Sequence, residues 1–191
     1  MEKIKFNIRF GTVFLIILMT TFSRLIPHPV NFAPIGAISL FGAAYFSRKS
    51  LALLVPVLSM WLSDLVINNI VYSQYFDGFV WFYQGFYWTY LSFPLIGVVG
   101  LVLLKRVKTH TVFVGSLIAS MVFYLVSNFG VWVSGTMYTK DFSGLITCYI
   151  AAIPFFKNTV LGDFVYCAVL FGGYEFVRSK IPVLRFQSVL E

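Results

Sequence analysis

The chain has 191 residues, of which 59% are hydrophobic and only 11% are charged. Because soluble domains usually carry about a quarter charged residues, this composition excludes an ordinary soluble domain. It is typical of an all-α integral membrane protein, which we expect to form a single domain over residues 1–191. The net charge of +7 would suggest nucleic-acid binding in a soluble protein. Here the basic residues flank apolar runs, so we attribute them to membrane orientation and contact with the lipid bilayer, and expect no nucleic-acid partner.

Six apolar runs follow one another along the chain. Five of them approach the ~20 residues with which a helix crosses a bilayer core of ~30 Å, and the second run is shorter. The predicted spans are 8–26, 34–47, 51–71, 86–104, 111–133 and 157–177. The sequence therefore predicts a six-helix transmembrane bundle.

The distribution of Lys and Arg predicts the orientation of that bundle. With a cytoplasmic N-terminus, eleven of the 14 basic residues fall inside and three fall outside, as the positive-inside rule favours. The inner set is Lys3, Lys5, Arg9, Arg48, Lys49, Lys105, Arg106, Lys108, Arg178, Lys180 and Arg185, and the outer set is Arg24, Lys140 and Lys157. Omitting the run 34–47 would reverse the later connections, so the same bias predicts that this short run crosses. We expect both termini to be cytoplasmic, in a bacterial inner membrane.

Two of the predicted outer connections are unusual. Residues 72–85 are rich in Tyr, Phe and Trp and contain no Lys or Arg, and rings with a polar tip favour the headgroup region. Residues 138–156 are apolar but read as too short to span. We predict that both segments are interfacial, and that Pro154 breaks the second one before the last span begins near Lys157.

Polar residues inside predicted spans are costly in a bilayer and therefore indicate function. Helical spacing gathers them into three stripes, each on one helix face. The stripes are Trp61, Asp64 and Asn68; Tyr124, Asn128 and Trp132; and Thr159, Asp163 and Tyr166. Counting from the predicted span ends places all three in the outer half, where Arg24 closes the first span and Asn31 follows it. The pattern predicts a cup that opens away from the cytoplasm.

Within this cup we expect a small-molecule substrate. The carboxylates and amides of Asp64, Asn68, Asn128 and Asp163 would form hydrogen bonds, the rings of Trp61, Tyr124, Trp132 and Tyr166 would line the walls, and Arg24 would offset charge. An alternative interpretation pairs Asp64 and Asp163 with Arg24 or Lys157 in purely structural ion pairs. No cofactor is predicted, since the sequence has no Cys/His cluster with metal spacing and no Gly-rich phosphate loop with its Lys.

Several segments carry a family resemblance. They are the residues RLIPHP at 24–29, NFAPIGAISLFGAAYF at 31–46, LSDLVI at 62–67, SNFGVW at 127–132 and CYIAAIPFFKNTVLGDFVYCAVLFGG at 148–173. The chain thereby resembles a family of small bacterial membrane proteins described as transport proteins, which is similar to the substrate-binding S components of energy-coupling-factor (ECF) transporters.

This resemblance implies a six-helix subunit that captures a vitamin-like metabolite from the outside. It also implies a partner, an ECF-type transmembrane subunit with ATPases. S components often dock through small residues spaced by four on the first helix. The first span lacks that pattern, so the face formed by Ala33 and Ala37, or by Ser39 and Ala43, is the alternative docking surface.

Two other functions stay open on the sequence. A structural or assembly protein of the cell envelope would use the polar residues to hold partner helices. An intramembrane enzyme would need two titratable groups, for example Asp64 and Asp163, to converge on one point. We expect a protein that is not an enzyme.

Overall fold

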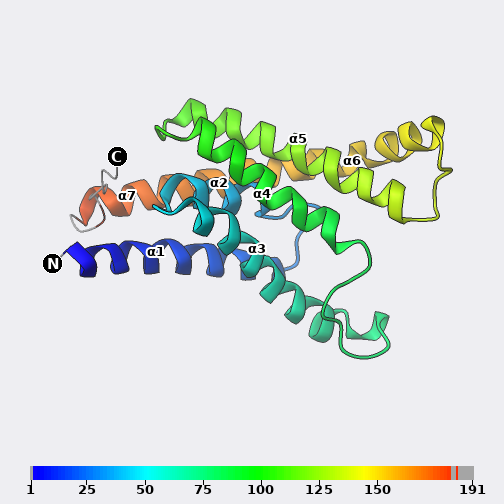
Figure 1. Cartoon of the computed structure of the whole chain (residues 1–191), viewed down its shortest axis with the longest axis horizontal. Helices are drawn as coiled ribbons and strands as arrows, with labels where there is room; N and C mark the ends of the chain where they lie inside the picture. The colour runs from blue at the N-terminus through cyan, green and yellow to red at the C-terminus, as the bar shows by residue number, and fades with distance from the viewer. Residues whose placement is uncertain (1, 182–183, 185–191) are drawn as a thin grey trace.

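The computed structural model describes residues 2–181 and 184, so Arg185 lies outside the described residues. These described residues are helical with connecting loops and form no β-strand (Figure 1). The helices are α1 (Glu2–Phe22), α2 (Ile35–Tyr45), α3 (Lys49–Val66), α4 (Phe86–Leu103), α5 (Thr109–Ser134), α6 (Phe142–Cys167) and α7 (Gly173–Lys180). Short 3-10 turns occur at Ser23–Leu25 and Ser73–Tyr75, and π turns at Ile67–Val71 and Ala168–Gly172.

Five of the helical segments are long and apolar enough to cross a membrane, which confirms the predicted all-α membrane class. They are Ile8–Leu25, Lys49–Val71, Phe86–Leu103, Thr109–Ser134 and Phe142–Lys180. Large apolar side chains such as Met19, Ile70 and Val102 are exposed on these helices. An apolar outer face of this kind suits contact with lipid tails rather than water.

The predicted helix break at Pro154 is wrong. α6 continues through this proline, and a π turn joins it to α7, so that residues 142–180 form one helical segment. Pro154 removes one backbone donor, but contacts with the neighbouring helix hold the turn before it together. The Tyr124 hydroxyl of α5 donates to the Tyr149 carbonyl at 2.6 Å, and the Tyr149 hydroxyl donates to the Leu125 carbonyl at 2.7 Å.

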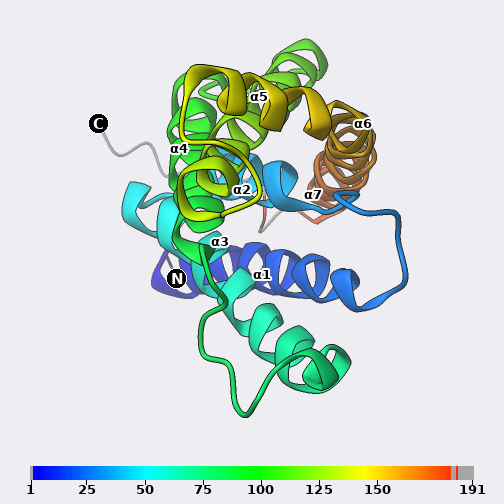
Figure 2. The ribbon, with the colours of Figure 1, turned by 90° about the vertical axis from the view of Figure 1, so that its right-hand side faces the viewer.

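Helix α2 lies at the centre of the bundle. Figure 2 shows it between α5 and α6 on one side and α1 and α3 on the other, and it packs against α1, α3, α4, α5 and α6. Its 11 residues cover only about 16 Å at 1.5 Å per residue, roughly half of the bilayer core. Ten of them are buried. The small side chains proposed as a docking face, Ala33, Ala37, Ser39 and Ala43, are at most 9% exposed, so that surface is closed to a partner subunit.

Glycines allow α4 to approach α2 and α3 closely. A Cβ atom added to Gly100 would lie 2.6 Å from the Cβ of Ala43, and one added to Gly97 would lie 2.5 Å from the Leu53 side chain. Small residues at such crossings are what permits tight helix packing in membranes. The position of α2 inside the bundle therefore depends on Gly100 having no side chain.

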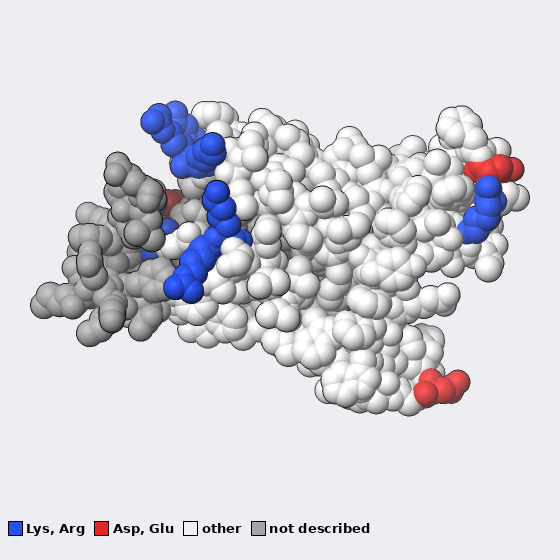
Figure 3. Space-filling model, viewed as in Figure 1, with Lys and Arg blue, Asp and Glu red and all other residues white. Residues whose placement is uncertain are grey.

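The two ends of the bundle differ in charge. Lys and Arg gather at the end where α1 begins and α7 ends, which is the left side of Figure 3. The connections α2–α3 and α4–α5 lie at that same end, whereas the α3–α4 and α5–α6 connections lie at the opposite end (Figure 1). The distribution of Lys and Arg in the sequence predicted this grouping of the connections.

Replacing Gly100 with alanine tests the α2–α4 contact. Because the new methyl group would collide with Ala43, we expect Gly100→Ala to lower the free energy of unfolding by about 1–3 kcal/mol, the usual cost of overpacking. Thermal unfolding in detergent, followed by size-exclusion chromatography, measures the loss. Gly11→Ala is the matched control, since nothing lies within 4 Å of its added Cβ, and an equal loss in both variants would contradict the packing argument.

Candidate functional site

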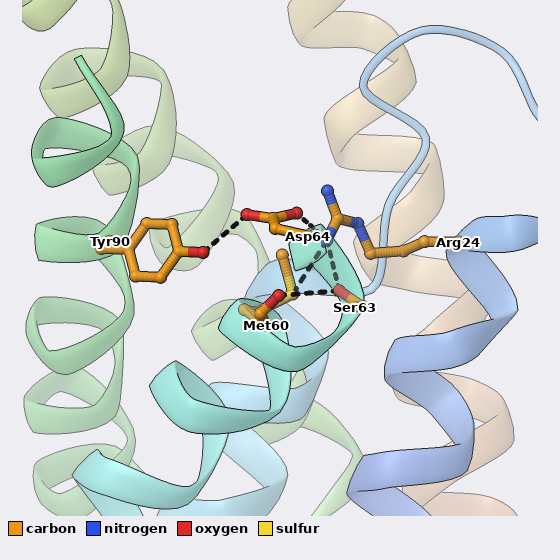
Figure 4. Close-up of polar contacts among 5 residues, drawn as sticks. All are labelled: Arg24, Met60, Ser63, Asp64 and Tyr90. Atoms are coloured by element: carbon orange, nitrogen blue, oxygen red, sulfur yellow. Dashed lines mark hydrogen bonds and ion pairs between the residues drawn. The ribbon is translucent and has the colours of Figure 1, made fainter. Parts of the chain in front are cut away.

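A buried ion pair joins α1 to α3. The guanidinium of Arg24, in the 3-10 turn after α1, donates from Nη1 to Asp64 Oδ1 at 2.6 Å and to Ser63 Oγ at 2.6 Å. The second carboxylate oxygen of Asp64 accepts the Tyr90 hydroxyl of α4 at 2.7 Å. Figure 4 shows these groups, with the Met60 sulfur 3.7 Å from the same Arg24 nitrogen. The Arg24 and Asp64 side chains are only 18% and 9% exposed.

This cluster confirms the predicted pairing of Asp64 with Arg24. Each oxygen of its carboxylate has a donor, so the charge is balanced inside a largely apolar bundle. Three helices contribute to it, because Arg24 follows α1, Asp64 lies on α3 and Tyr90 lies on α4. The cluster thus fixes how these helices meet.

Asp163 has different partners, and the predicted pairing with Arg24 or Lys157 is wrong for it among the described residues. On α6, its Oδ1 accepts the Ala37 backbone N–H at 3.2 Å, and its Oδ2 accepts the Ser120 hydroxyl at 2.6 Å. Asp163 is only 1% exposed. Since α2 starts at Ile35, the carboxylate of Asp163 on α6 caps the N-terminus of the buried helix α2. The dipole of a helix favours negative charge at that end.

The absence of a side chain at Gly36 completes this arrangement. A Cβ at Gly36 would lie 2.6 Å from both carboxylate oxygens of Asp163. Only glycine leaves room for the carboxylate to reach the first turn of α2. One further helix, α5, joins the same contact through Ser120.

The stripe on α5 faces the first half of α6. The Tyr124 hydroxyl and the Trp132 indole donate to the backbone carbonyls of Tyr149 and Thr139, the latter at 2.8 Å. The Asn128 side chain donates to the Tyr124 carbonyl of its own helix at 2.8 Å. Asp141 caps α6 by accepting the Gly144 N–H at 2.7 Å, and this bond lowers the pKa of the Asp141 carboxyl. The Tyr124 bond thus connects α5 to α6, and the Trp132 bond connects α5 to the loop between them.

The remaining predicted residues lie around the ion pair and the loops. The Tyr166 hydroxyl is 3.0 Å from the Ser23 hydroxyl, next to Arg24 in sequence. Trp61 donates to the Trp81 carbonyl at 3.2 Å, and Asn68 is half-buried on the same helical segment. Asn31 is exposed, with a left-handed φ of 63°. The ten predicted residues therefore fall into separate contact groups, and substrate binding by them stays a prediction.

Asn69 makes a contact between segments that the sequence did not predict. Its side-chain carbonyl accepts the Val80 N–H at 2.6 Å, and its amide donates to the Val80 carbonyl at 2.9 Å. This paired contact ties the aromatic segment 72–85 to the π turn that follows α3. The adjacent Asn68 was chosen instead because it shares a helix face with Asp64, whereas the π turn Ile67–Val71 changes the spacing at this point.

A pocket of about 370 Å³, which the sequence did not predict, lies between the start of α4 and the end of α5. Its lining residues are Tyr83, Gln84, Gly85, Trp88, Thr89, Ser127, Gly130, Val131, Ser134, Gly135 and Thr136. The Trp88 side chain packs directly on Gly130, where any Cβ would collide with it. Burial raises the pKa of the Tyr83 phenol above its ordinary value.

The fold and the buried charges define an all-helical bundle of the membrane type. Over residues 4–184 the chain matches the model of a family of unknown function, DUF6580, and it belongs to that family. Comparisons with curated proteins and with solved structures give no match.

Removing one donor tests the Asp64 cluster. Because the hydroxyl of Tyr90 donates to a buried charged group, we expect Tyr90→Phe to cost about 1.5–3 kcal/mol in the free energy of unfolding. The loss should shrink in an Asp64→Asn background, and a double-mutant cycle measured by thermal unfolding in detergent detects this coupling. Tyr72→Phe, at an exposed tyrosine, is the control; additive losses in the cycle would contradict the described contact.

A second cycle tests the capping of α2. We expect Asp163→Ala to cost about 0.5–2 kcal/mol through loss of the cap, and Gly36→Ala to cost about 1–3 kcal/mol through overpacking. In the double variant the shortened side chain at 163 leaves space for the new methyl group. The double variant should therefore lose less free energy of unfolding than the two single variants added together. Strictly additive losses would show that the two residues do not contact each other.

Proposed function

We propose that this protein is a membrane transport protein that captures a small metabolite, in the manner of an ECF S component. The metabolite binds in the pocket between α4 and α5 and carries a polar group on a ring or chain of small size. The pocket is the observation that carries this proposal. Its volume of about 370 Å³ lies within the ~300–1,000 Å³ typical of small-molecule sites.

The chemistry of the lining supports binding of a partly polar molecule. Tyr83 and Trp88 offer ring surfaces, while Thr89, Ser127 and Gln84 offer hydroxyl and amide groups. A few polar groups on an otherwise apolar wall set the orientation of a ligand in such sites. This end of the bundle is also the one away from the main basic cluster (Figures 1 and 3).

A chain of rings connects the pocket to the buried ion pair. The Tyr83 ring lies 6.5 Å from the Tyr90 ring, and the Tyr90 hydroxyl donates to Asp64. A ligand that shifts Tyr83 would therefore act on a residue that holds α1, α3 and α4 together. We assign the predicted residues Arg24 and Asp64 to this supporting and transmitting role.

The proposed topology follows from the charge distribution. The basic end faces the cytoplasm of a bacterial inner membrane, with both termini there. The loop 26–34 together with α2 completes the sixth crossing. Since the sequence contains no ATP-binding motif, uptake would depend on a separate energy-coupling subunit with ATPases, which must dock on a surface other than α2.

Pocket variants test the proposal. Ser127→Leu places an apolar side chain in the pocket, and Gln84→Ala removes a lining amide. We expect extraction and mass spectrometry of the purified full chain to show a metabolite enriched with the wild type and reduced about tenfold or more in both variants, which corresponds to about 1.4 kcal/mol of binding free energy or more.

Two controls accompany these variants. Gln74→Ala removes an exposed amide in the same aromatic segment, and Ser143→Leu adds the same apolar group on the exposed start of α6. Both should retain the metabolite. A wild type without any enriched metabolite, or equal retention in all five proteins, would favour a structural or assembly role instead.

A further inference from the structure

The opposite end of the bundle holds a second pocket of about 410 Å³. It is lined by Arg9, Ala44, Tyr45, Leu104, Lys105, Arg106, Val107, Glu175 and Arg178. Among the described residues, four basic side chains and one carboxylate thus border one hollow. They come from α1, the α4–α5 connection and α7, which are far apart in the sequence.

Hydrogen bonds hold part of this lining in place. Arg9 Nη2 donates to the Tyr45 carbonyl at 3.0 Å, and the Tyr45 hydroxyl donates to Glu175 Oε1 at 2.7 Å. Arg178 Nη1 donates to the same carboxylate oxygen at 2.9 Å. Glu175 therefore positions Arg178, and Lys105 and Arg106 add two further basic side chains to the described lining of the hollow.

We propose that this basic pocket binds a phosphate-bearing anion. Guanidinium groups match phosphate oxygens with charge-assisted hydrogen bonds, and like charges crowded around a hollow favour a bound anion. The Lys and Arg side chains gather at this end of the molecule (Figure 3). Basic pockets between helices at a membrane surface are suited to anionic headgroups. The same chemistry would accept a free phosphate, so the experiment separates the two sources.

The test uses a matched pair of double variants. Lys105→Gln/Arg106→Gln removes two basic residues of the pocket, both in the short α4–α5 connection. Arg48→Gln/Lys49→Gln removes two exposed basic residues at the start of α3, at the same end of the bundle, which do not border the pocket. The two variants change net charge equally, so a general surface effect would appear in both.

The full chain is placed in nanodiscs of phosphatidylcholine with or without phosphatidylglycerol, and retained lipid is counted by native mass spectrometry. In a second arm, inorganic pyrophosphate is titrated into phosphatidylcholine nanodiscs while thermal unfolding is followed. We expect a loss of roughly tenfold or more in the apparent affinity for the anion in the Lys105/Arg106 variant only.

Selective phosphatidylglycerol retention supports a lipid headgroup as the ligand, and selective stabilisation by pyrophosphate alone supports a free phosphate. Equal losses in both double variants, or no binding in either arm, would overturn the proposal. Because this pocket lies at the end opposite to the α4–α5 pocket, its failure leaves the metabolite experiment unaffected.

Discussion

The start of helix α2 places a constraint on the whole bundle. The first N–H groups of a helix have no partner within it, and in α2 they lie inside an apolar interior rather than at a water interface. Asp163 answers this need by accepting the Ala37 N–H from another helix. That contact requires glycine at position 36 and brings Ser120 of α5 into the same cluster. Helices α5 and α6 are thus aligned by the capping of a third helix, α2, which is only 11 residues long.

The Arg24 cluster likewise aligns α1, α3 and α4. Asp64 has one oxygen on Arg24 and the other on Tyr90, so α3 is held between the end of α1 and the start of α4. Charges in such an environment persist only when paired. The aromatic segment that follows α3 is tied down separately, by the paired amide contact between Asn69 and Val80.

A functional consequence follows from how these polar groups are used. The carboxylates of Asp64 and Asp163 have their acceptor oxygens occupied by neighbouring helices, whereas the α4–α5 pocket is bordered by rings, hydroxyls and an amide at an open end. Under the proposed function, a ligand in this pocket would leave the hydrogen bonds of both carboxylates in place and would act on the Asp64 cluster through Tyr83 and Tyr90. At the other end, the basic pocket presents chemistry of the opposite kind, so the two ends of one small bundle are suited to different ligands.

The sequence by itself determined the all-α membrane class and the approximate positions of the long apolar helices other than α6, because apolar run length is a direct response to bilayer thickness. It also predicted an ion pair between Arg24 and Asp64 as an alternative to substrate binding, since the two residues have opposite charges and similar depths in the predicted bundle. The tertiary structure decided the rest. Pro154 lies within α6 because contacts with α5 hold the helix through it. Helix α2 is a buried core helix because Gly100 on α4 leaves room for Ala43. The pockets are lined by side chains from elements distant in sequence, and no local sequence pattern predicts that these elements come into contact.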